Sequence, residues 1–203
     1  MRGSLVRVQQ DPMLERWLTN TYYTFLINPA LFFFRKIHPL WITLLATISG
    51  ICAAIAIHTP LLALLLMVLS GYFDSLDGAI ARSFHKQSKA GAACDIISDR
   101  IVESSIIIAL FTIDHSRAIF CLMMLASVLI CITSFLVVAI FSANNSSKSF
   151  YYSPGLIERP EAFCFFAAML LLPSLFIPLA IMFTLAVFAT AFIRLFAFIF
   201  SNK

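Results

Sequence analysis

The sequence predicts an all-α integral membrane protein with six transmembrane helices and an N-terminal amphipathic helix that lies in the membrane interface. Three observations support this fold class. Of the 203 residues, 61% are hydrophobic and 12% are charged, whereas a soluble domain has about 25% charged residues. The apolar residues form long continuous runs, which is typical of spanning helices. The Lys and Arg residues stand at the ends of these runs, where cytoplasmic loops carry them.

The N-terminal element covers about residues 1–36 and differs from the rest of the chain. Between residues 11 and 36, aromatic side chains are mixed with charged ones, and the segment ends in Arg35 and Lys36. Aromatic residues with terminal bases suit a helix in the interface. An additional spanning helix is the alternative for this segment.

A six-helix bundle is expected over about residues 40–200, since a spanning helix needs roughly 20 mainly apolar residues. The first four helices are predicted at residues 40–57, from 61 to beyond 73, 91–113 and 118–142. The run 162–200 is too long for one span, and Pro173 and Pro178 favour a break into two. We therefore expect residues 1–203 to form a single membrane domain.

The basic residues predict the orientation of the bundle. Lys and Arg precede the first span and follow the second and fourth, whereas the opposite loops hold only Arg117. Cytoplasmic loops are enriched in Lys and Arg, so both termini are expected on the cytoplasmic side of the inner (cytoplasmic) membrane. The net charge of +4 does not indicate a nucleic-acid partner, because the bases lie at the ends of apolar runs.

Four of the ten acidic residues lie where the second predicted span ends and the third begins. They are Asp74, Asp77, Asp95 and Asp99. The first two are three residues apart and the last two four apart, so each pair shares one face of its helix. The short polar stretch 83–90 joins the two helices as an antiparallel pair. Two columns of carboxylates are therefore expected to face each other at the cytoplasmic end of the bundle.

Carboxylates this close repel one another and are costly beside lipid. A divalent cation offsets the repulsion, two ions being the number we expect, and oxygen-only ligands favour Mg²⁺ or Mn²⁺. Two such ions also hold a pyrophosphate during displacement at phosphorus. Gly78, Ala81 and Gly91 leave room for a nucleotide, and Arg82 neutralises phosphate charge. Solvated helix ends or ion pairs within the bundle are the alternative interpretation.

These residues form a recognisable pattern. Asp74-x-x-Asp77-Gly78-x-x-Ala81-Arg82, followed after eight residues by Gly91-x-x-x-Asp95-x-x-x-Asp99, resembles the signature of the CDP-alcohol phosphatidyltransferase family at every fixed position. The sequence Pro39-Leu40-Trp41-Ile42-Thr43 is similar to the Pro-x-x-(Val/Ile)-Thr opening of the family's first membrane helix. The resemblance extends to members of the phosphatidylglycerophosphate synthase and phosphatidylinositol phosphate synthase type.

The resemblance implies a phospholipid-biosynthesis enzyme that transfers a phosphatidyl group from CDP-diacylglycerol to an alcohol and releases CMP. It also implies a homodimer among membrane lipids. Asp99 would be the general base, and the implied metal ligands are Asp74, Asp77, Asp95 and Asp99. The implied CDP-binding residues are Thr43, Gly78, Ala81, Arg82 and Gly91.

The acceptor is the least determined part of the prediction. The candidate acceptor-binding residues are Arg159, Arg194, Lys148 and Glu103. Arginine pairs bidentately with phosphate oxygens, which favours glycerol 3-phosphate or an inositol phosphate over serine or another amino alcohol. Residues 158–161 resemble a Glu-Arg-x-Glu-Arg segment of members that use inositol phosphate, but Ala162 replaces the second Arg, so glycerol 3-phosphate is preferred. Glu103 in a structural ion pair, and Arg194 extended to the membrane interface, are the alternatives for those two residues.

Three other classes of protein are alternatives. A divalent-cation transporter is expected to hold its carboxylates near the membrane midplane on broken helices, whereas these acids lie toward one face. An intramembrane prenyltransferase also uses aspartate pairs and Mg²⁺, but with different spacing and without the Asp-Gly-x-x-Ala-Arg run. A non-enzymatic membrane scaffold leaves the four aspartates unexplained. Metal-dependent binding of CMP separates the enzyme from the transporter.

Overall fold

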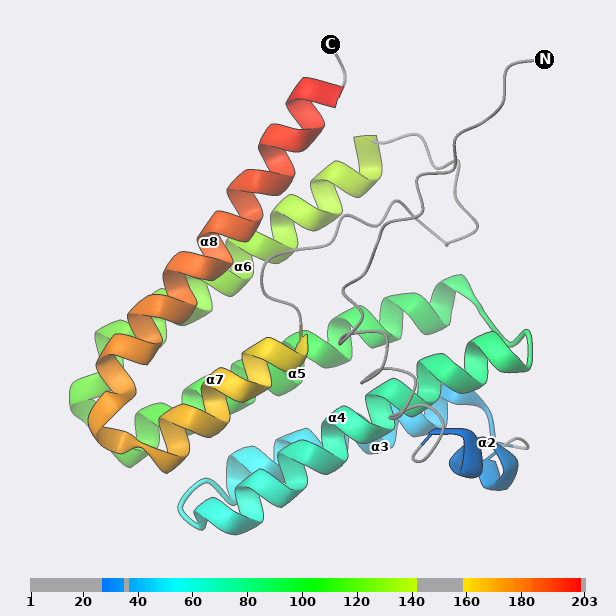
Figure 1. Cartoon of the computed structure of the whole chain (residues 1–203), viewed down its shortest axis with the longest axis horizontal. Helices are drawn as coiled ribbons and strands as arrows, with labels where there is room; N and C mark the ends of the chain where they lie inside the picture. The colour runs from blue at the N-terminus through cyan, green and yellow to red at the C-terminus, as the bar shows by residue number, and fades with distance from the viewer. Residues whose placement is uncertain (1–26, 35–36, 142–158, 202–203) are drawn as a thin grey trace, which may run out of the picture.

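The computed structural model describes residues 27–34, 37–141 and 159–201, and within these residues it contains seven α-helices and no strand (Figure 1). The helices are α2 (Asn28–Phe34), α3 (Pro39–Ile55), α4 (Pro60–Ser83), α5 (Lys89–Ile113), α6 (Ala118–Phe141), α7 (Arg159–Leu171) and α8 (Phe176–Ser201). Short 3₁₀ turns, η2 (His115–Arg117) and η3 (Pro173–Leu175), precede α6 and α8. The predicted all-α class is confirmed.

The helices form two packed groups that share one end. Figure 1 shows α3, α4 and α5 running beside one another, with α6 and α8 as a second pair and α7 between the groups. The first group packs closely at Gly50 of α3, where a Cβ atom would lie 2.5 Å from Cγ1 of Val102 on α5. Small residues allow such close approach between membrane helices. This packing positions α5, which carries Asp95 and Asp99, against α3.

Proline and serine residues set the helix boundaries. Pro39 and Pro60 lie in the first turns of α3 and α4, where the missing N–H has no intrahelical partner to lose. Ser88 caps α5, since its Oγ accepts a hydrogen bond from the Gly91 N–H at 3.0 Å. Pro173 begins η3 after α7 has ended at Leu171. The predicted break within residues 162–200 is therefore confirmed.

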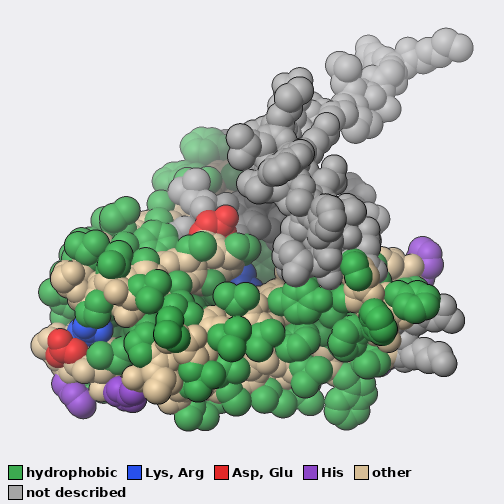
Figure 2. Space-filling view, turned by 60° about the horizontal axis from the view of Figure 1, so that its bottom comes forward, with side chains coloured by type: hydrophobic (Ala, Val, Ile, Leu, Met, Phe, Trp, Pro, Cys, Tyr) green, Lys and Arg blue, Asp and Glu red, His purple; other side chains and the backbone are tan. Residues whose placement is uncertain are grey.

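Three described segments are long and apolar enough to cross a membrane. They are Pro60–Ser83, His115–Phe141 and Pro173–Phe200, and the apolar helix Pro39–Ile55 is shorter. Figure 2 shows hydrophobic side chains covering most of one face of the molecule, with few charged groups among them. Because water does not favour so extensive an apolar surface, these helices place the chain in a bilayer as an integral membrane protein.

The turn between α5 and α6 closes the end of the bundle remote from the aspartates. Asp114 accepts a hydrogen bond from the Ser116 N–H at 2.9 Å, and its hydrogen bonds with Ser116 hold the pKa of this carboxyl below its usual value. Arg117 is buried, with its guanidinium 4.4 Å from the ring centre of Phe176. This cation–π contact ties η2 to the first residue of α8.

Most of the predicted interfacial helix lies outside the described residues. Its described part is the short helix α2 together with Ile27. Ile27 and Ala30 are buried in a cluster with residues of α3 and α4, whereas Phe32 and Phe33 are exposed. The described turn of this segment therefore has one apolar face against the bundle and another facing outward.

Candidate active site

A cavity of about 800 Å³ lies between the two groups of helices, within the size range of about 300–1,000 Å³ for small-molecule sites. Its wall gathers most of the residues that the sequence predicts as functional. These are Thr43, Asp77, Gly78, Ala81, Arg82, Gly91, Asp95, Asp99, Glu103, Arg159 and Arg194. Lys148 lies outside the described residues.

Three carboxylates converge at this cavity, and two of them, Asp95 and Asp99, belong to its lining. Asp74 on α4 and Asp95 and Asp99 on α5 each place one carboxylate oxygen within 4.8 Å of the other two. The segment between α4 and α5 lets Asp74 of the first predicted column lie near Asp95 and Asp99 of the second. Mg²⁺ and Mn²⁺ prefer oxygen ligands. The donor set of this cluster therefore fits the predicted divalent cation.

Asp77 points to a different neighbour. Its side chain is buried, and its Oδ2 accepts a hydrogen bond from the hydroxyl of Thr43 on α3 at 2.5 Å. Asp77 thus lies on the α3 side of α4, beside the cluster of three rather than within it. Its assignment as a metal ligand stays a prediction. The contact with Thr43 was not predicted, since it joins residues 34 positions apart.

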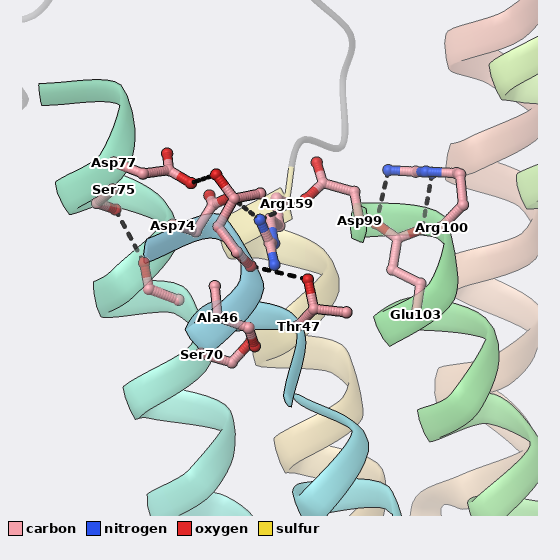
Figure 3. Close-up of polar contacts among 12 residues, drawn as sticks. Ala46, Thr47, Ser70, Asp74, Ser75, Asp77, Asp99, Arg100, Glu103 and Arg159 are labelled. Atoms are coloured by element: carbon pink, nitrogen blue, oxygen red, sulfur yellow. Dashed lines mark hydrogen bonds and ion pairs between the residues drawn. The ribbon is translucent and has the colours of Figure 1, made fainter. Parts of the chain in front are cut away.

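Arg159, the first residue of α7, lies between the two columns. Its guanidinium forms ion pairs with both Asp74 and Asp99 (Figure 3). The side chain is 11% exposed, and it lies 5.4 Å from the ring centre of Phe163, one helical turn further along. The structure thus places the predicted acceptor-binding residue Arg159 beside Asp99. Its simultaneous contact with Asp74 is an additional finding.

Glu103 lies one turn further along α5 from Asp99 and is buried. It forms a two-pronged ion pair with Arg100, with O–N distances of 2.7 and 3.0 Å (Figure 3). Of the two interpretations of Glu103, the structure shows the ion pair with an arginine. Arg100 lines the cavity and was missed as a site residue. Its position directly after Asp99, in a predicted spanning helix where charge is expensive, was the available signal.

Arg194 lines the cavity from α8. It is 8% exposed, and its Nη1 donates to the backbone carbonyl of Cys131 at 3.1 Å and to the Ser134 hydroxyl at 3.4 Å. The guanidinium also lies 5.2 Å from the ring centre of Phe135. Arg194 is therefore held between α6 and α8, instead of extending to an exposed helix end.

Gly78 and Arg82 form one compact wall of the cavity on α4. A Cβ atom on Gly78 would lie 3.1 Å from Nη1 of Arg82. The absence of a side chain at this glycine thus lets the guanidinium lie close to the helix backbone. Anionic groups that approach this wall meet a positive charge over a bare stretch of helix.

Comparison with known proteins identifies the family. Residues 36–200 match the CDP-alcohol phosphatidyltransferase family. The CDP-diacylglycerol–inositol 3-phosphatidyltransferase of Candida albicans is 33% identical over 75 residues, which are 37% of this chain and 31% of that protein. The phosphatidylinositol phosphate synthase of Corynebacterium glutamicum is 30% identical over 102 residues, which are 46% of this chain and 44% of that protein. The chain thus spans less than half the length of these relatives. Since the family match covers most of the sequence, the chain belongs to the CDP-alcohol phosphatidyltransferase family.

Proposed function

We propose that this protein transfers a phosphatidyl group from CDP-diacylglycerol to an alcohol acceptor and releases CMP. The observation that carries this proposal is the convergence of Asp74, Asp95 and Asp99 at a cavity that also holds Arg82 and Arg159. Carboxylates for cations and arginines for phosphate suit a reaction at a pyrophosphate. Family membership supports the same reaction.

The donor side of the site is proposed to lie along α4 and the first turns of α5. Asp74, Asp77, Asp95 and Asp99 would hold two Mg²⁺ or Mn²⁺ ions, which supply positive charge to the pyrophosphate when bound. Gly78, Ala81 and Gly91 leave the wall open for the CDP group. Arg82 pairs with a phosphate oxygen. Thr43 orients the carboxylate of Asp77 through its hydrogen bond.

Asp99 is proposed to act as the general base. Its carboxylate accepts the proton of the acceptor hydroxyl, whose oxygen forms a bond to the β-phosphorus of the donor. The bond from that phosphorus to the bridging oxygen breaks, and CMP leaves with this oxygen. Asp99 suits this task because it lies at the cavity wall beside Arg159, which would place an anionic acceptor next to the base.

The acceptor is proposed to be a phosphorylated polyol. Arg159 and Arg194 line the same cavity, and Lys148 is proposed to join them. The printed name of one relative refers to phosphatidylinositol phosphate, which supports an inositol phosphate, whereas the name of the other refers to inositol. Ala162, buried in the first turn of α7, removes a base from the inositol-phosphate pattern and supports glycerol 3-phosphate, which we prefer.

The membrane arrangement that suits this chemistry has six spans, formed by α3 to α8, with the cavity open to the cytoplasm. The helices α3, α5 and α7 complete the bundle although they are shorter or more polar than the other three. A homodimer is the proposed assembly.

A panel of acceptors tests the proposal. The purified protein in lipid nanodiscs would receive CDP-diacylglycerol, Mn²⁺ and radiolabelled glycerol 3-phosphate, inositol phosphate, free inositol or serine, and the lipid product would be identified. We expect a product from one of the two phosphate esters. A product from serine or free inositol alone would refute the argument from the arginines. Arg159→Ala and Arg194→Ala should raise the acceptor KM with little change in CDP-lipid binding.

A further inference from the structure

We propose that Arg159 is a positioning residue that competes with the divalent cation for Asp74 and Asp99 and turns to the acceptor's phosphate when the cation binds. The competition is a property of the side chains themselves. The movement of Arg159 to the acceptor's phosphate rests on the proposed function. The experiment below therefore separates the two parts.

The competition follows from the atoms that Arg159 contacts. Its Nη1 forms ion pairs with an oxygen of Asp74 and an oxygen of Asp99, and these residues are two of the three whose carboxylates converge. A guanidinium hydrogen and a metal ion need the same oxygen lone pairs. The two positive charges also repel each other among side chains that are only 11–23% exposed. Both cannot occupy this position together.

The charges of the site show why a counter-ion is needed there. Four aspartates gather at this end of α4 and α5, and burial makes their repulsion costly. The neighbouring Arg100 directs its guanidinium to Glu103. Arg159 instead extends from α7 and brings one positive charge to both Asp74 on α4 and Asp99 on α5. It thus supplies part of the charge that the cation supplies when bound.

The two arginines of the cavity differ in how they are held. Arg194 donates to a backbone carbonyl of α6 and to the Ser134 hydroxyl, so its position does not depend on the aspartates. Arg159 is the first residue of its helix and is held by carboxylates that a cation would take over. Rotation of its side chain moves the guanidinium into the cavity, toward the side lined by Arg194. Arg194 is then the fixed half of the phosphate site and Arg159 the movable half.

The effects of the cation and the acceptor on each other's binding must be reciprocal. If the cation releases Arg159 for the acceptor's phosphate, the phosphate holds Arg159 away from the aspartates and strengthens cation binding by the same factor. Cation and acceptor thus bind cooperatively, and both are in place before Asp99 receives a proton.

Mn²⁺ binding, measured by electron paramagnetic resonance on the full chain in nanodiscs, tests the competition without any turnover. We expect Arg159→Gln to lower the Kd for Mn²⁺ at least fivefold. Arg194→Gln removes the same charge from the other end of the cavity and should change this Kd less than twofold. Arg159→Lys keeps the charge but loses the forked guanidinium, so its Kd for Mn²⁺ should lie between those of the wild type and Arg159→Gln. An unchanged or raised Kd in Arg159→Gln overturns the competition. If that variant does not fold, Arg159→Lys decides by the same criterion.

The movement of Arg159 to the phosphate is tested by repeating the Mn²⁺ titration with glycerol 3-phosphate and, separately, with inositol phosphate. The concentration of free Mn²⁺ is corrected for its binding to the ester. One ester should lower the Kd for Mn²⁺ in the wild type at least threefold and leave it unchanged in Arg159→Gln. If neither ester changes the wild-type Kd, the movement of Arg159 to the phosphate is overturned. If CMP is never released but Arg159→Gln still tightens Mn²⁺ binding, the proposed function fails and the competition stands.

Discussion

At the scale of single residues, Asp99 carries the largest share of the proposed chemistry. It lies at the cavity wall, within 4.8 Å of its carboxylate neighbours Asp74 and Asp95, and it pairs with Arg159. A bound cation would take the place of Arg159 on this carboxylate and fix its orientation toward the acceptor. Asp74 and Asp95 are proposed only to bind positive charge.

Replacement of Asp99 by Asn separates the base from the ligands. Asn has nearly the same shape but accepts no proton, so Asp99→Asn should lower kcat by about 100-fold or more while the Kd for the donor CDP-diacylglycerol changes little. Asp74→Asn and Asp95→Asn should instead raise the Kd for Mn²⁺. Turnover and Mn²⁺ binding would be measured on the same preparations. Near-normal turnover in Asp99→Asn would remove Asp99 from the role of base.

The hydrogen bond between Thr43 and Asp77 predicts a stability effect. Thr43→Val keeps the shape of the side chain but removes the hydroxyl donor to a buried carboxylate, which should cost about 1–3 kcal/mol. Thr43→Ser retains the hydroxyl and is the matched control. Thermal unfolding in detergent should show a lower midpoint for Thr43→Val than for Thr43→Ser. Equal midpoints for the two variants would show that the hydrogen bond contributes nothing measurable.

At the scale of helices, the sequence predicts boundaries better than contacts. The expected runs 91–113 and 118–142 correspond to Lys89–Ile113 and Ala118–Phe141, because apolar runs and prolines act locally. The spacing also puts Asp74 and Asp77 on one face of α4. The spacing does not show that Asp74 contacts residues of α5 and α7 while Asp77 contacts α3. Those contacts depend on how each helix is rotated against neighbours distant in sequence.

The crossing of α3 and α5 gives a test of this packing. Gly50→Ala places a Cβ atom 2.5 Å from Val102, which should cost about 1–3 kcal/mol through overpacking. Gly71→Ala is the matched control, because its Cβ would lie at an ordinary 3.7 Å from Phe163. The unfolding midpoint should fall only for Gly50→Ala, and Val102→Ala should restore part of the loss. Equal midpoints for the two alanine variants would contradict the close crossing.

At the scale of the whole molecule, the two ends of the bundle differ in charge. One end holds the cavity with its aspartates and arginines, whereas the other is closed by the contact between Arg117 and Phe176. Because most Lys and Arg residues precede the first predicted span or follow the second and fourth, we predict from the positive-inside tendency that the cavity end faces the cytoplasm. A water-soluble acceptor would then reach Asp99 from the cytoplasm, while the lipid donor enters from the bilayer.

Labelling of single cysteines in a cysteine-free background measures this orientation. Cysteine substituted for Lys86 or for Lys148 should react with a membrane-impermeant reagent from the cytoplasmic side only. Cysteine substituted for His58 or for Ser116 should react from the opposite side only. Labelling of Lys86 and His58 positions from the same side would refute the six-span arrangement.

Metal-dependent release of CMP is the most direct test of the proposed reaction. Purified protein would be given CDP-diacylglycerol and the acceptor panel, with Mg²⁺ or Mn²⁺ or with excess chelator, and released CMP would be quantified. We predict CMP release that requires the cation and an acceptor and that stops on chelation. Undiminished release in excess chelator would contradict the role of the aspartate cluster, and cation transport without binding of CMP would assign the chain to a different class of protein.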